Sequence, residues 1–264
     1  MELAKKDYWL LFNDNNLLLK ETNNSYEIPA REDIEALADI KLSLAAAQYI
    51  GSFDNNAYYA ANISTQNIPQ CFLFKNIRQV LATLASDQFA LVLRAFHILT
   101  WIEKNKYCGC CGAALNISKN ELTLNCSSCH NIIYPRISPA IIVAVTKDNK
   151  LLLARAKNFK TTMYSVLAGF VEPGETLEEC ISRELNEEVG IEVTNIRYFG
   201  SQAWPFPDSL MIAFTAQWAK GDIIIDNNEI IEAGWFSANQ LPKIPEPISI
   251  SRQLIDSFVA SQNQ

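Results

Sequence analysis

The chain has 264 residues, of which 49% are hydrophobic, and this is enough apolar material to bury the core of one large or two modest domains. Its formal net charge of −7 disfavours general nucleic-acid binding, because a polyanionic substrate would have to be held by local basic residues or by bound metal. No apolar run is long enough for a signal peptide at residues 1–16 or for a transmembrane helix elsewhere, so we expect a cytoplasmic protein with no membrane partner.

The first part of the chain, residues 1–104, is expected to form a domain that contains a sheet and ends in a helix. Over residues 1–77 short apolar runs alternate with Asn-rich turns, which is typical of a small sheet. From Ser86 to Lys104 apolar residues recur at helical spacing and predict an amphipathic helix. His97 on this helix is expected to pack in the core or to lie on the surface, and not to bind a ligand.

Two pairs of cysteines follow this helix, each with two residues between its members: Cys108 with Cys111, and Cys126 with Cys129. Paired thiolates at this spacing predict a zinc ribbon over residues 105–134, with one structural Zn²⁺ per chain closed by four protein ligands. Cys110 and His130 could substitute for Cys111 or Cys129, but the paired spacing favours the first assignment. An odd total of seven cysteines without a secretion signal indicates reduced thiols, and we expect Cys71 and Cys180 to be buried small hydrophobes.

Residues 135–264 alternate strand-like and helix-like segments, which predicts an α/β domain. Two apolar strands separated by Asp-Asn-Lys are expected to pair as a hairpin, at residues 140–145 and 151–154. The remaining elements that we expect are three strands and a closing helix, at residues 193–202, 210–219, 229–236 and 249–259.

A first motif at residues 169–191 carries seven residues at fixed spacing: Gly169, Glu175, Arg183, Glu184, Glu187, Glu188 and Gly190. Thr176 followed by Glu179 is a capping box, and Gly190 can end a helix in the left-handed conformation, so we expect a helix over residues 177–189. Three of the glutamates, 184, 187 and 188, then fall within roughly 100° of arc. Carboxylates crowded in this way repel one another unless a divalent cation such as Mg²⁺ or Mn²⁺ neutralises them. A solvated acidic helix face is the alternative interpretation, but it does not explain the glycines and the arginine.

The spacing of these seven residues resembles the signature of the Nudix hydrolases, enzymes that cleave nucleoside diphosphates linked to another group. The resemblance implies a Nudix fold, in which a mixed sheet lies between helices. It also implies that Glu184, Glu188 and Glu229 hold the divalent cation together with the main-chain carbonyl of Ala168. Glu187 would complete the acidic cluster, and Glu184, Glu187 and Glu188 would be the catalytic residues.

A second motif, Ser-Gln-Ala-Trp-Pro-Phe-Pro-Asp-Ser at residues 201–209, follows the first. Together with the ribbon it resembles the NudC-type NADH pyrophosphatases, whose bacterial members also hydrolyse NAD-capped RNA. Ala203 stands where that branch carries proline, which loosens the backbone slightly. Trp204 and Phe206 offer flat faces on which a nicotinamide or adenine ring can stack, the alternative being an aromatic turn in the core.

The resemblance to this branch also implies a homodimer and a set of substrate contacts. The dinucleotide pocket would be lined by Gln202, Ala203, Trp204, Pro205, Phe206, Pro207, Asp208, Ser209, Tyr134, Glu121, Arg78 and Ser251. Glu121 and Arg78 lie outside both motifs and could equally be a surface charge of the ribbon and a cation beside a helix.

The function that these features predict is metal-dependent hydrolysis of the diphosphate bond of NADH or NAD to NMN(H) and AMP, with removal of NAD caps from RNA. RNA would need a basic path to the pocket, for which residues 157–160 are a candidate. One alternative is a Nudix hydrolase that prefers ADP-ribose or nucleoside diphosphate sugars. Another is a non-catalytic nucleotide- or RNA-binding module, which the small number of basic residues in the ribbon disfavours.

Overall fold

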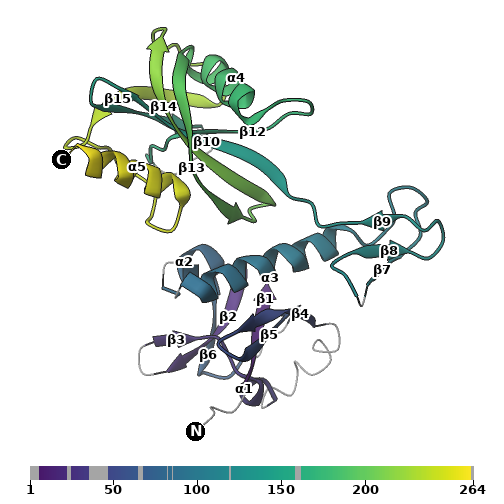
Figure 1. The fold of residues 1–264 in the computed structure, drawn as a ribbon. Helices are drawn as coiled ribbons and strands as arrows, with labels where there is room; N and C mark the ends of the chain where they lie inside the picture. Colours follow the sequence, from purple (N-terminus) through teal and green to yellow (C-terminus); the bar gives the residue numbers. More distant parts are fainter. Residues whose placement is uncertain are drawn as a thin grey trace. The chain divides into compact units, whose positions relative to one another are not determined.

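The computed structural model of this chain describes residues 6–22, 25–35, 47–64, 68–81, 83–84, 86–118, 120–157 and 162–262. The chain divides into two compact units, Met1–Arg136 and Ile137–Gln264, each built on its own sheets (Figure 1). No helix in the described part of the chain is long and apolar enough to span a membrane.

Among its described residues, the first unit contains a six-stranded sheet with the order β3-β2-β1-β5-β4, in which β6 pairs with β2 and β1 runs parallel to β5. The strands are β1 (Asp7–Asn13), β2 (Asn16–Thr22), β3 (Ser25–Glu27), β4 (Gln48–Phe53), β5 (Asn56–Asn62) and β6 (Phe72–Asn76). The helices are α1 (Arg31–Glu35), α2 (Ile77–Leu81) and α3 (Ser86–Lys104).

The long helix α3 has the bounds that the sequence predicts and packs against β1, β4 and β5. Its apolar stripe is buried, as Val92 and Phe96 illustrate, and the ring of Phe96 lies 5.8 Å from that of Phe12 on β1. His97 is half-buried, and its Nε2 atom lies 2.8 Å from the carbonyl oxygen of Arg136. This histidine therefore packs against its own unit, as expected.

A small antiparallel sheet follows α3 in the first unit, and its described strands are β7 (Leu115–Ile117), β8 (Leu124–Cys126) and β9 (Ile132–Ile133).

Cys180 in the second unit is fully buried, as predicted. Cys71 is exposed, so the prediction that it is buried is wrong. It lies in the turn before β6, where its main-chain carbonyl pairs with the N–H of Glu21 at 2.8 Å and its side chain is left to solvent.

The described residues of the second unit form a six-stranded mixed sheet with the order β13-β14-β10-β11-β15, in which β12 also pairs with β10. The strands are β10 (Ser138–Lys147), β11 (Lys150–Ala156), β12 (Leu167–Phe170), β13 (Glu192–Trp204), β14 (Ser209–Lys220) and β15 (Ile230–Ser237). The predicted hairpin is confirmed, because β10 and β11 pair antiparallel across Asp148 and Asn149. Both turn residues have positive φ, 46° and 60°, which Asp and Asn tolerate well.

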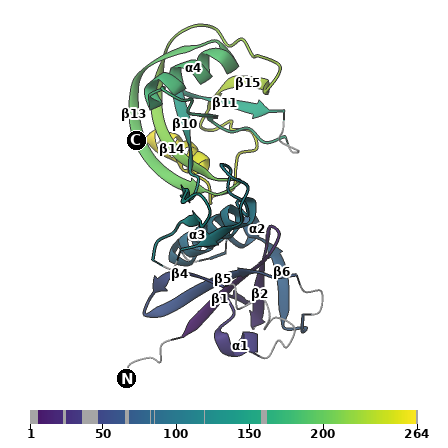
Figure 2. The same ribbon diagram turned by 90° about the vertical axis from the view of Figure 1, so that its right-hand side faces the viewer.

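Two helices, α4 (Leu177–Val189) and α5 (Ile250–Ser261), cover opposite faces of this sheet (Figures 1 and 2). The alternation of side chains along a strand explains how β10 serves both. Its Ile141 and Val143 pack in the core under α4, whereas Ile142 and Ala144 pack in the core under α5. The mixed sheet between helices is therefore the α/β fold that the sequence predicts.

Candidate functional site

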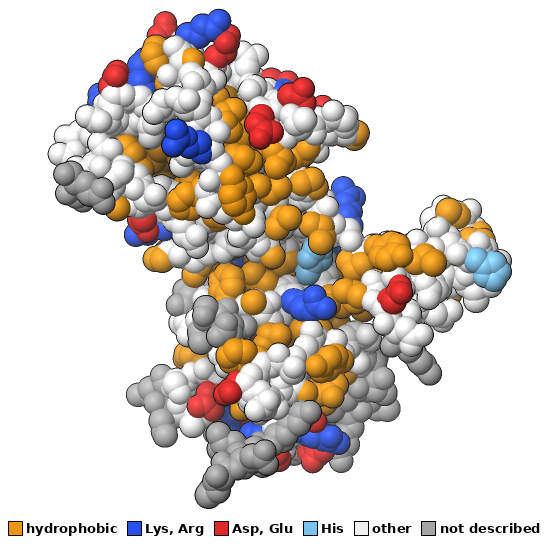
Figure 3. Space-filling view, in the orientation of Figure 1, with side chains coloured by type: hydrophobic (Ala, Val, Ile, Leu, Met, Phe, Trp, Pro, Cys, Tyr) orange, Lys and Arg blue, Asp and Glu red, His pale blue; other side chains and the backbone are white. Residues whose placement is uncertain are grey.

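Both ends of α4 are set by the residues that the sequence singles out. The side chain of Thr176 accepts a hydrogen bond from the N–H of Glu179 at 3.2 Å, and the Glu179 carboxylate accepts one from the N–H of Thr176 at 2.8 Å. Gly190 ends the helix with a φ of 71°. The capping box and the left-handed glycine thus fix the helix at its predicted bounds, and with them the direction of each glutamate. Acidic side chains lie on the surface around α4 in the space-filling view (Figure 3).

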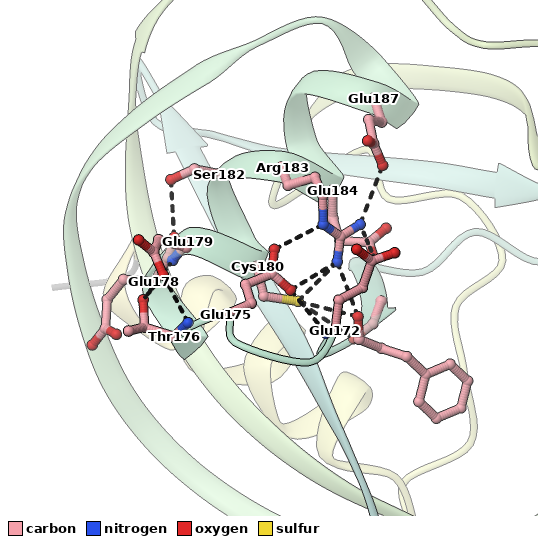
Figure 4. Close-up of polar contacts among 12 residues, drawn as sticks. Glu172, Glu175, Thr176, Glu178, Glu179, Cys180, Ser182, Arg183, Glu184 and Glu187 are labelled. Atoms are coloured by element: carbon pink, nitrogen blue, oxygen red, sulfur yellow. Dashed lines mark hydrogen bonds and ion pairs between the residues drawn. The ribbon is translucent and has the colours of Figure 1, made fainter.

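Arg183 lies at the centre of the acidic cluster (Figure 4). Its Nε and Nη2 atoms donate to Oε1 and Oε2 of Glu175 at 2.8 and 3.0 Å. Its Nη1 atom donates to Oε1 of Glu184 at 2.9 Å and to Oε2 of Glu187 at 3.2 Å. The pKa of Glu175 falls to about 2, because Arg183 and then the backbone N–H of Glu172 hydrogen-bond its charged form. Arg183 therefore orders three carboxylates and neutralises part of their charge.

Glu188 is the buried member of the cluster, with only 8% of the residue exposed. Among the described residues its Oε2 atom has no hydrogen-bond partner. Burial, followed by the nearby carboxylates of Glu184 and Glu229, raises the pKa of Glu188 to about 8. A buried carboxylate beside like charges and without a donor fits a divalent cation, since hard oxygen ligands suit Mg²⁺ and Mn²⁺.

Gly169 on β12 leaves the space that Glu184 occupies. A Cβ atom on this residue would lie 1.9 Å from Cδ of Glu184, so any side chain here would force the Glu184 carboxylate to move. The neighbouring residue Ala168 pairs with Ile142 on β10, and both line the same cavity as Glu188. The first glycine of the motif thus lets the Glu184 carboxylate approach the strand closely and keep its position.

The turn before β15 brings Glu229 to the cluster. Asp226 accepts hydrogen bonds from the N–H groups of Asn228 at 3.1 Å, Glu229 at 2.9 Å and Ile230 at 3.0 Å. The N–H of Asp226 itself donates to the carbonyl oxygen of Glu188 at 3.2 Å. Asp226 is a residue that sequence reasoning missed, although an aspartate followed by Asn-Asn is typical of such a turn.

A cavity of about 270 Å³ lies between β11 and β12, and Glu188 and Glu229 line it together with Ala168 and Ser165. Ser251 on α5 does not line this cavity. Its hydroxyl oxygen instead lies 2.7 Å from that of Ser165, and the residue is only 7% exposed. Ser165 was not predicted, because no local pattern in the sequence marks it.

The second motif forms the tip of the β13–β14 hairpin. Its residues are divided among the end of β13, the turn and the start of β14: Gln202, Ala203 and Trp204; Pro205, Phe206, Pro207 and Asp208; and Ser209. The rings of Trp204 and Phe206 pack edge to face, with centroids 5.3 Å apart and an interplanar angle of 72°. Both residues are half-buried, so each ring has a partner and retains accessible surface.

Strand pairing places the two motifs at the same end of the sheet. Ser209 pairs with Ser138 at the start of β10, and the N–H of Ser138 donates to the carbonyl oxygen of Asp208 at 2.9 Å. Two residues further along β10, Ala140 pairs with Phe170 at the end of β12. The hairpin tip of residues 204–209, here called the aromatic hairpin, and the loop that leads into α4 thus flank the same short stretch of β10.

Three predicted substrate contacts lie in the other unit. Arg78 is in α2, Glu121 is in the loop before β8, and Tyr134 follows β9 and is 64% exposed. Their assignment to the pocket stays a prediction. Of the basic segment proposed as an RNA path, residues 158–160 lie outside the described residues.

The four predicted zinc ligands converge. The Sγ atoms of Cys108, Cys111, Cys126 and Cys129 all lie within 4.8 Å of one another, and this group contains neither Cys110 nor His130. The backbone N–H of Cys110, followed by that of Cys111, lowers the pKa of Cys108 to about 6. The pKa of Cys126 is also lowered, chiefly by the backbone N–H of Cys129. A set of four thiols of which two ionise readily matches the donors of a structural zinc site.

Family models match both units. A model described as a NUDIX domain matches residues 136–258, and one described as an NADH pyrophosphatase-like rudimentary NUDIX domain matches residues 6–101. The "NAD-capped RNA hydrolase NudC" of Pseudomonas fluorescens (strain Pf0-1) is 40% identical over 98% of this chain and 89% of its own length. The chain belongs to the NudC family of Nudix hydrolases.

Other members of the NudC family give the same result. A protein of the same name from Chromobacterium violaceum is 39% identical over 94% of this chain and 89% of its own length. Among solved structures, a NUDIX hydrolase from Nitrosomonas europaea has a TM-score of 0.52 and 23% identity, and covers 60% of this chain and 92% of its own. That likeness supports the Nudix fold alone.

Proposed function

We propose that this protein hydrolyses the diphosphate bond of NADH and NAD, giving NMN(H) and AMP, and that it removes NAD caps from RNA. The observation that carries the proposal is that one sheet supports two features. One is the buried, unpartnered carboxylate of Glu188, which lines a cavity with Ile142 and Ala168, and the other is the aromatic hairpin, which pairs with β10 four residues before Ile142, at Ser138. Relatives about 40% identical are named for hydrolysis of NAD-capped RNA, which supports the same substrate class.

The acidic cluster is the proposed catalytic centre. Glu184, Glu188 and Glu229, with the main-chain carbonyl of Ala168, would hold Mg²⁺ or Mn²⁺, and the orphaned oxygen and raised pKa of Glu188 fit that role. When bound, the cation supplies positive charge that neutralises phosphate oxygens and makes the attacking water more acidic.

The chain's own residues would then move the proton and hold the geometry. Glu188 or Glu187 would take the proton of a water that attacks phosphorus in line, and a mononucleotide would leave on the opposite side. Arg183 keeps the cluster aligned through its bonds to Glu175 and Glu184. Because these contacts exist before substrate binds, little reorganisation is needed during the reaction.

Recognition of the dinucleotide is proposed for residues 202–209, some of which would contact the ligand while others position those that do. Trp204 and Phe206 would stack on a nicotinamide or adenine ring, since half-buried aromatic rings offer apolar faces to a planar ligand. Tyr134, Glu121 and Arg78 of the first unit are proposed as further contacts.

A structural role is proposed for the ribbon, with one Zn²⁺ held by the four cysteines and no open position for substrate. We further propose the division into residues 1–104, 105–134 and 135–264, a homodimer, and a cytoplasmic location, where the seven cysteines would stay reduced. Light scattering coupled to size exclusion would measure the oligomeric state.

The test compares initial rates on NADH, NAD and ADP-ribose, with Mg²⁺ or Mn²⁺, and identifies products by chromatography. We expect NMN(H) and AMP from NADH and NAD, and an RNA 5′-monophosphate from NAD-capped RNA. The Glu188→Gln variant should stay folded and lose several orders of magnitude in turnover, as expected when a catalytic carboxylate is removed. Faster cleavage of ADP-ribose would favour the alternative hydrolase. Tight, metal-independent RNA binding with no product from any substrate would favour the binding module.

A further inference from the structure

Gln202 makes two hydrogen bonds to the main chain at the start of α5. Its Nε2 atom donates to the carbonyl oxygen of Ile248 at 2.8 Å, and its Oε1 atom accepts from the N–H of Ile250 at 2.7 Å. Since a carbonyl needs a donor and an N–H needs an acceptor, these partners also fix which way the amide points. The side chain therefore acts as a clasp between β13 and the segment of residues 248–251.

The same segment holds the wall of the cavity. Ser251 is hydrogen-bonded to Ser165 at 2.7 Å, and Ser165 lines the cavity that contains Glu188 and Glu229. Four consecutive residues, 248–251, thus contact the aromatic hairpin's strand on one side and the cavity wall on the other. Ser251 and Ser165 are 86 positions apart in sequence, so this link exists only in the folded chain.

Core packing and a helix cap hold the segment of residues 248–251 in place. Ile250 is 3% exposed and lies in the core under α5, and Ser249 caps the helix by accepting the N–H of Arg252 at 3.3 Å. A Cβ atom on Gly200 would lie 3.8 Å from Cδ1 of Ile250, so β13 runs in contact with this residue. A buried and capped helix start moves little compared with a free loop.

The direction of the strand connects the clasp to the aromatic rings. Gln202 pairs with Met211, which packs in the core on the α5 side of the sheet. Side chains two residues apart on a strand face the same side, so Trp204 faces the α5 side as well. Gln202 and Trp204 are therefore successive residues on the same face of β13, so the amide lies next to the ring that it would position.

We propose that Gln202 and Ser251 are positioning residues for dinucleotide recognition. Through residues 248–251 they hold the aromatic hairpin in register with the cavity that contains Glu188. The amide of Gln202 forms its two hydrogen bonds with the main chain of Ile248 and Ile250. It therefore acts on the substrate through Trp204 and not by contact. This inference deepens the proposed function and rests on it, because it assigns the source of the pocket's geometry.

The experiment measures kcat and KM for NADH with Mn²⁺ in four proteins: wild type, Gln202→Met, Trp204→Ala and the double variant. Methionine keeps the length of the side chain and removes both hydrogen bonds. We expect Gln202→Met to raise KM about tenfold and to change kcat less than about threefold, since misplacement of a binding group by about 1 Å has effects of this order or more. In the Trp204→Ala background the same change should alter KM less than about twofold, because coupled residues are not additive.

Two further variants sharpen the result. Ser251→Ala should raise KM, whereas Ser261→Ala, on the last turn of the same helix, should leave it unchanged.

Several outcomes would overturn the inference. An equal rise in KM from Gln202→Met with and without Trp204 would mean that the amide contacts substrate directly. A lower melting temperature with unchanged KM would mean a structural role only. If wild type hydrolyses no dinucleotide, the proposed function fails, but hydrogen exchange still tests whether Gln202 holds the hairpin. The backbone N–H groups of the non-proline residues in 203–209 should exchange faster in Gln202→Met than in wild type, and equal rates would refute the inference.

Discussion

Replacing Glu188 with glutamine is expected to stabilise the second unit when no divalent cation is present. The carboxylate is buried, its Oε2 atom has no partner among the described residues, and its pKa is raised to about 8 by burial and by the carboxylates of Glu184 and Glu229. Glutamine has nearly the same shape and no charge. The variant therefore removes the unfavourable charge while keeping the packing.

The pKa sets the magnitude. The difference between about 8 and the ordinary value of 4.5 corresponds to on the order of 5 kcal/mol at about 1.4 kcal/mol per pKa unit. Partial hydration of the carboxylate lowers this value, and we expect a gain of about 2 to 4 kcal/mol at pH 8. For a unit of this size that gain is a rise of about 10 °C in melting temperature.

The sign of the pH dependence follows from proton binding. Between pH 4.5 and about 8 the folded wild type binds a proton at Glu188 more readily than the unfolded chain does. The wild type therefore loses stability as pH rises through this window, and the variant lacks that loss. The gain from Glu188→Gln should be near zero below pH 4.5 and should grow to its full value at about pH 8.

Scanning calorimetry at pH 4, 6 and 8 measures the gain in stability of Glu188→Gln over wild type. Both proteins are first desalted to remove loosely bound cations. No strong chelator is used, so that the ribbon keeps its metal. Glu187→Gln is the matched control, because that side chain is 59% exposed and its replacement should change stability by less than about 0.5 kcal/mol. Added Mn²⁺ should raise the melting temperature of wild type more than that of Glu188→Gln. A Glu188→Gln protein no more stable than wild type at pH 8 would refute the reasoning.

Three further changes test other parts of the site. Gly169→Ala places a Cβ atom 1.9 Å from Cδ of Glu184, so the Glu184 carboxylate would have to move. We expect kcat/KM for NADH to fall at least about 100-fold, while the circular dichroism spectrum stays unchanged. Near-normal rates would contradict the close fit between Gly169 and Glu184. Glu175 has its pKa lowered to about 2 by Arg183, so its stabilising effect is complete above pH 4.5 and is lost as pH falls toward 2. Acid unfolding of Glu175→Gln should lack this component, and an unchanged acid profile would argue against it. Cys126→Ser should lower bound zinc, measured by atomic absorption, and should remove amide protection in residues 105–134, whereas full zinc content would point to a different ligand.

The parts of the fold that the sequence predicted depend on local signals. The bounds of α4 follow from Thr176 and Gly190, whose capping roles require only neighbours within one turn. The β10–β11 hairpin follows from Asp148 and Asn149, which accept positive φ. The convergence of the four cysteines follows from their paired spacing. In each case the information lies within about two dozen residues of sequence.

The parts that were missed depend on contacts between distant segments. Ser165 meets Ser251 across 86 positions, and no periodicity marks either residue. Asp226 orients Glu229, but a turn aspartate has many possible uses in a sequence. Cys71 was expected in the core from its residue type alone, whereas its exposure depends on how the turn before β6 meets β2. Residue type indicates average burial, and tertiary contacts decide the individual case.

This division between local and distant contacts has a consequence for substrate choice. The proposed catalytic carboxylates lie largely on one helix, so the first motif can specify them within a short stretch of sequence. The geometry of the pocket draws on β13, on Ser165 and on residues 248–251, which are separate in sequence and joined by Gln202 and Ser251. If Gln202 and Ser251 position the aromatic hairpin as proposed, substitutions at either residue would shift it without altering any proposed catalytic group. A chain can therefore keep an intact first motif while its preference among diphosphates changes, and for that reason selectivity has to be measured on variants of the clasp as well as of the motif.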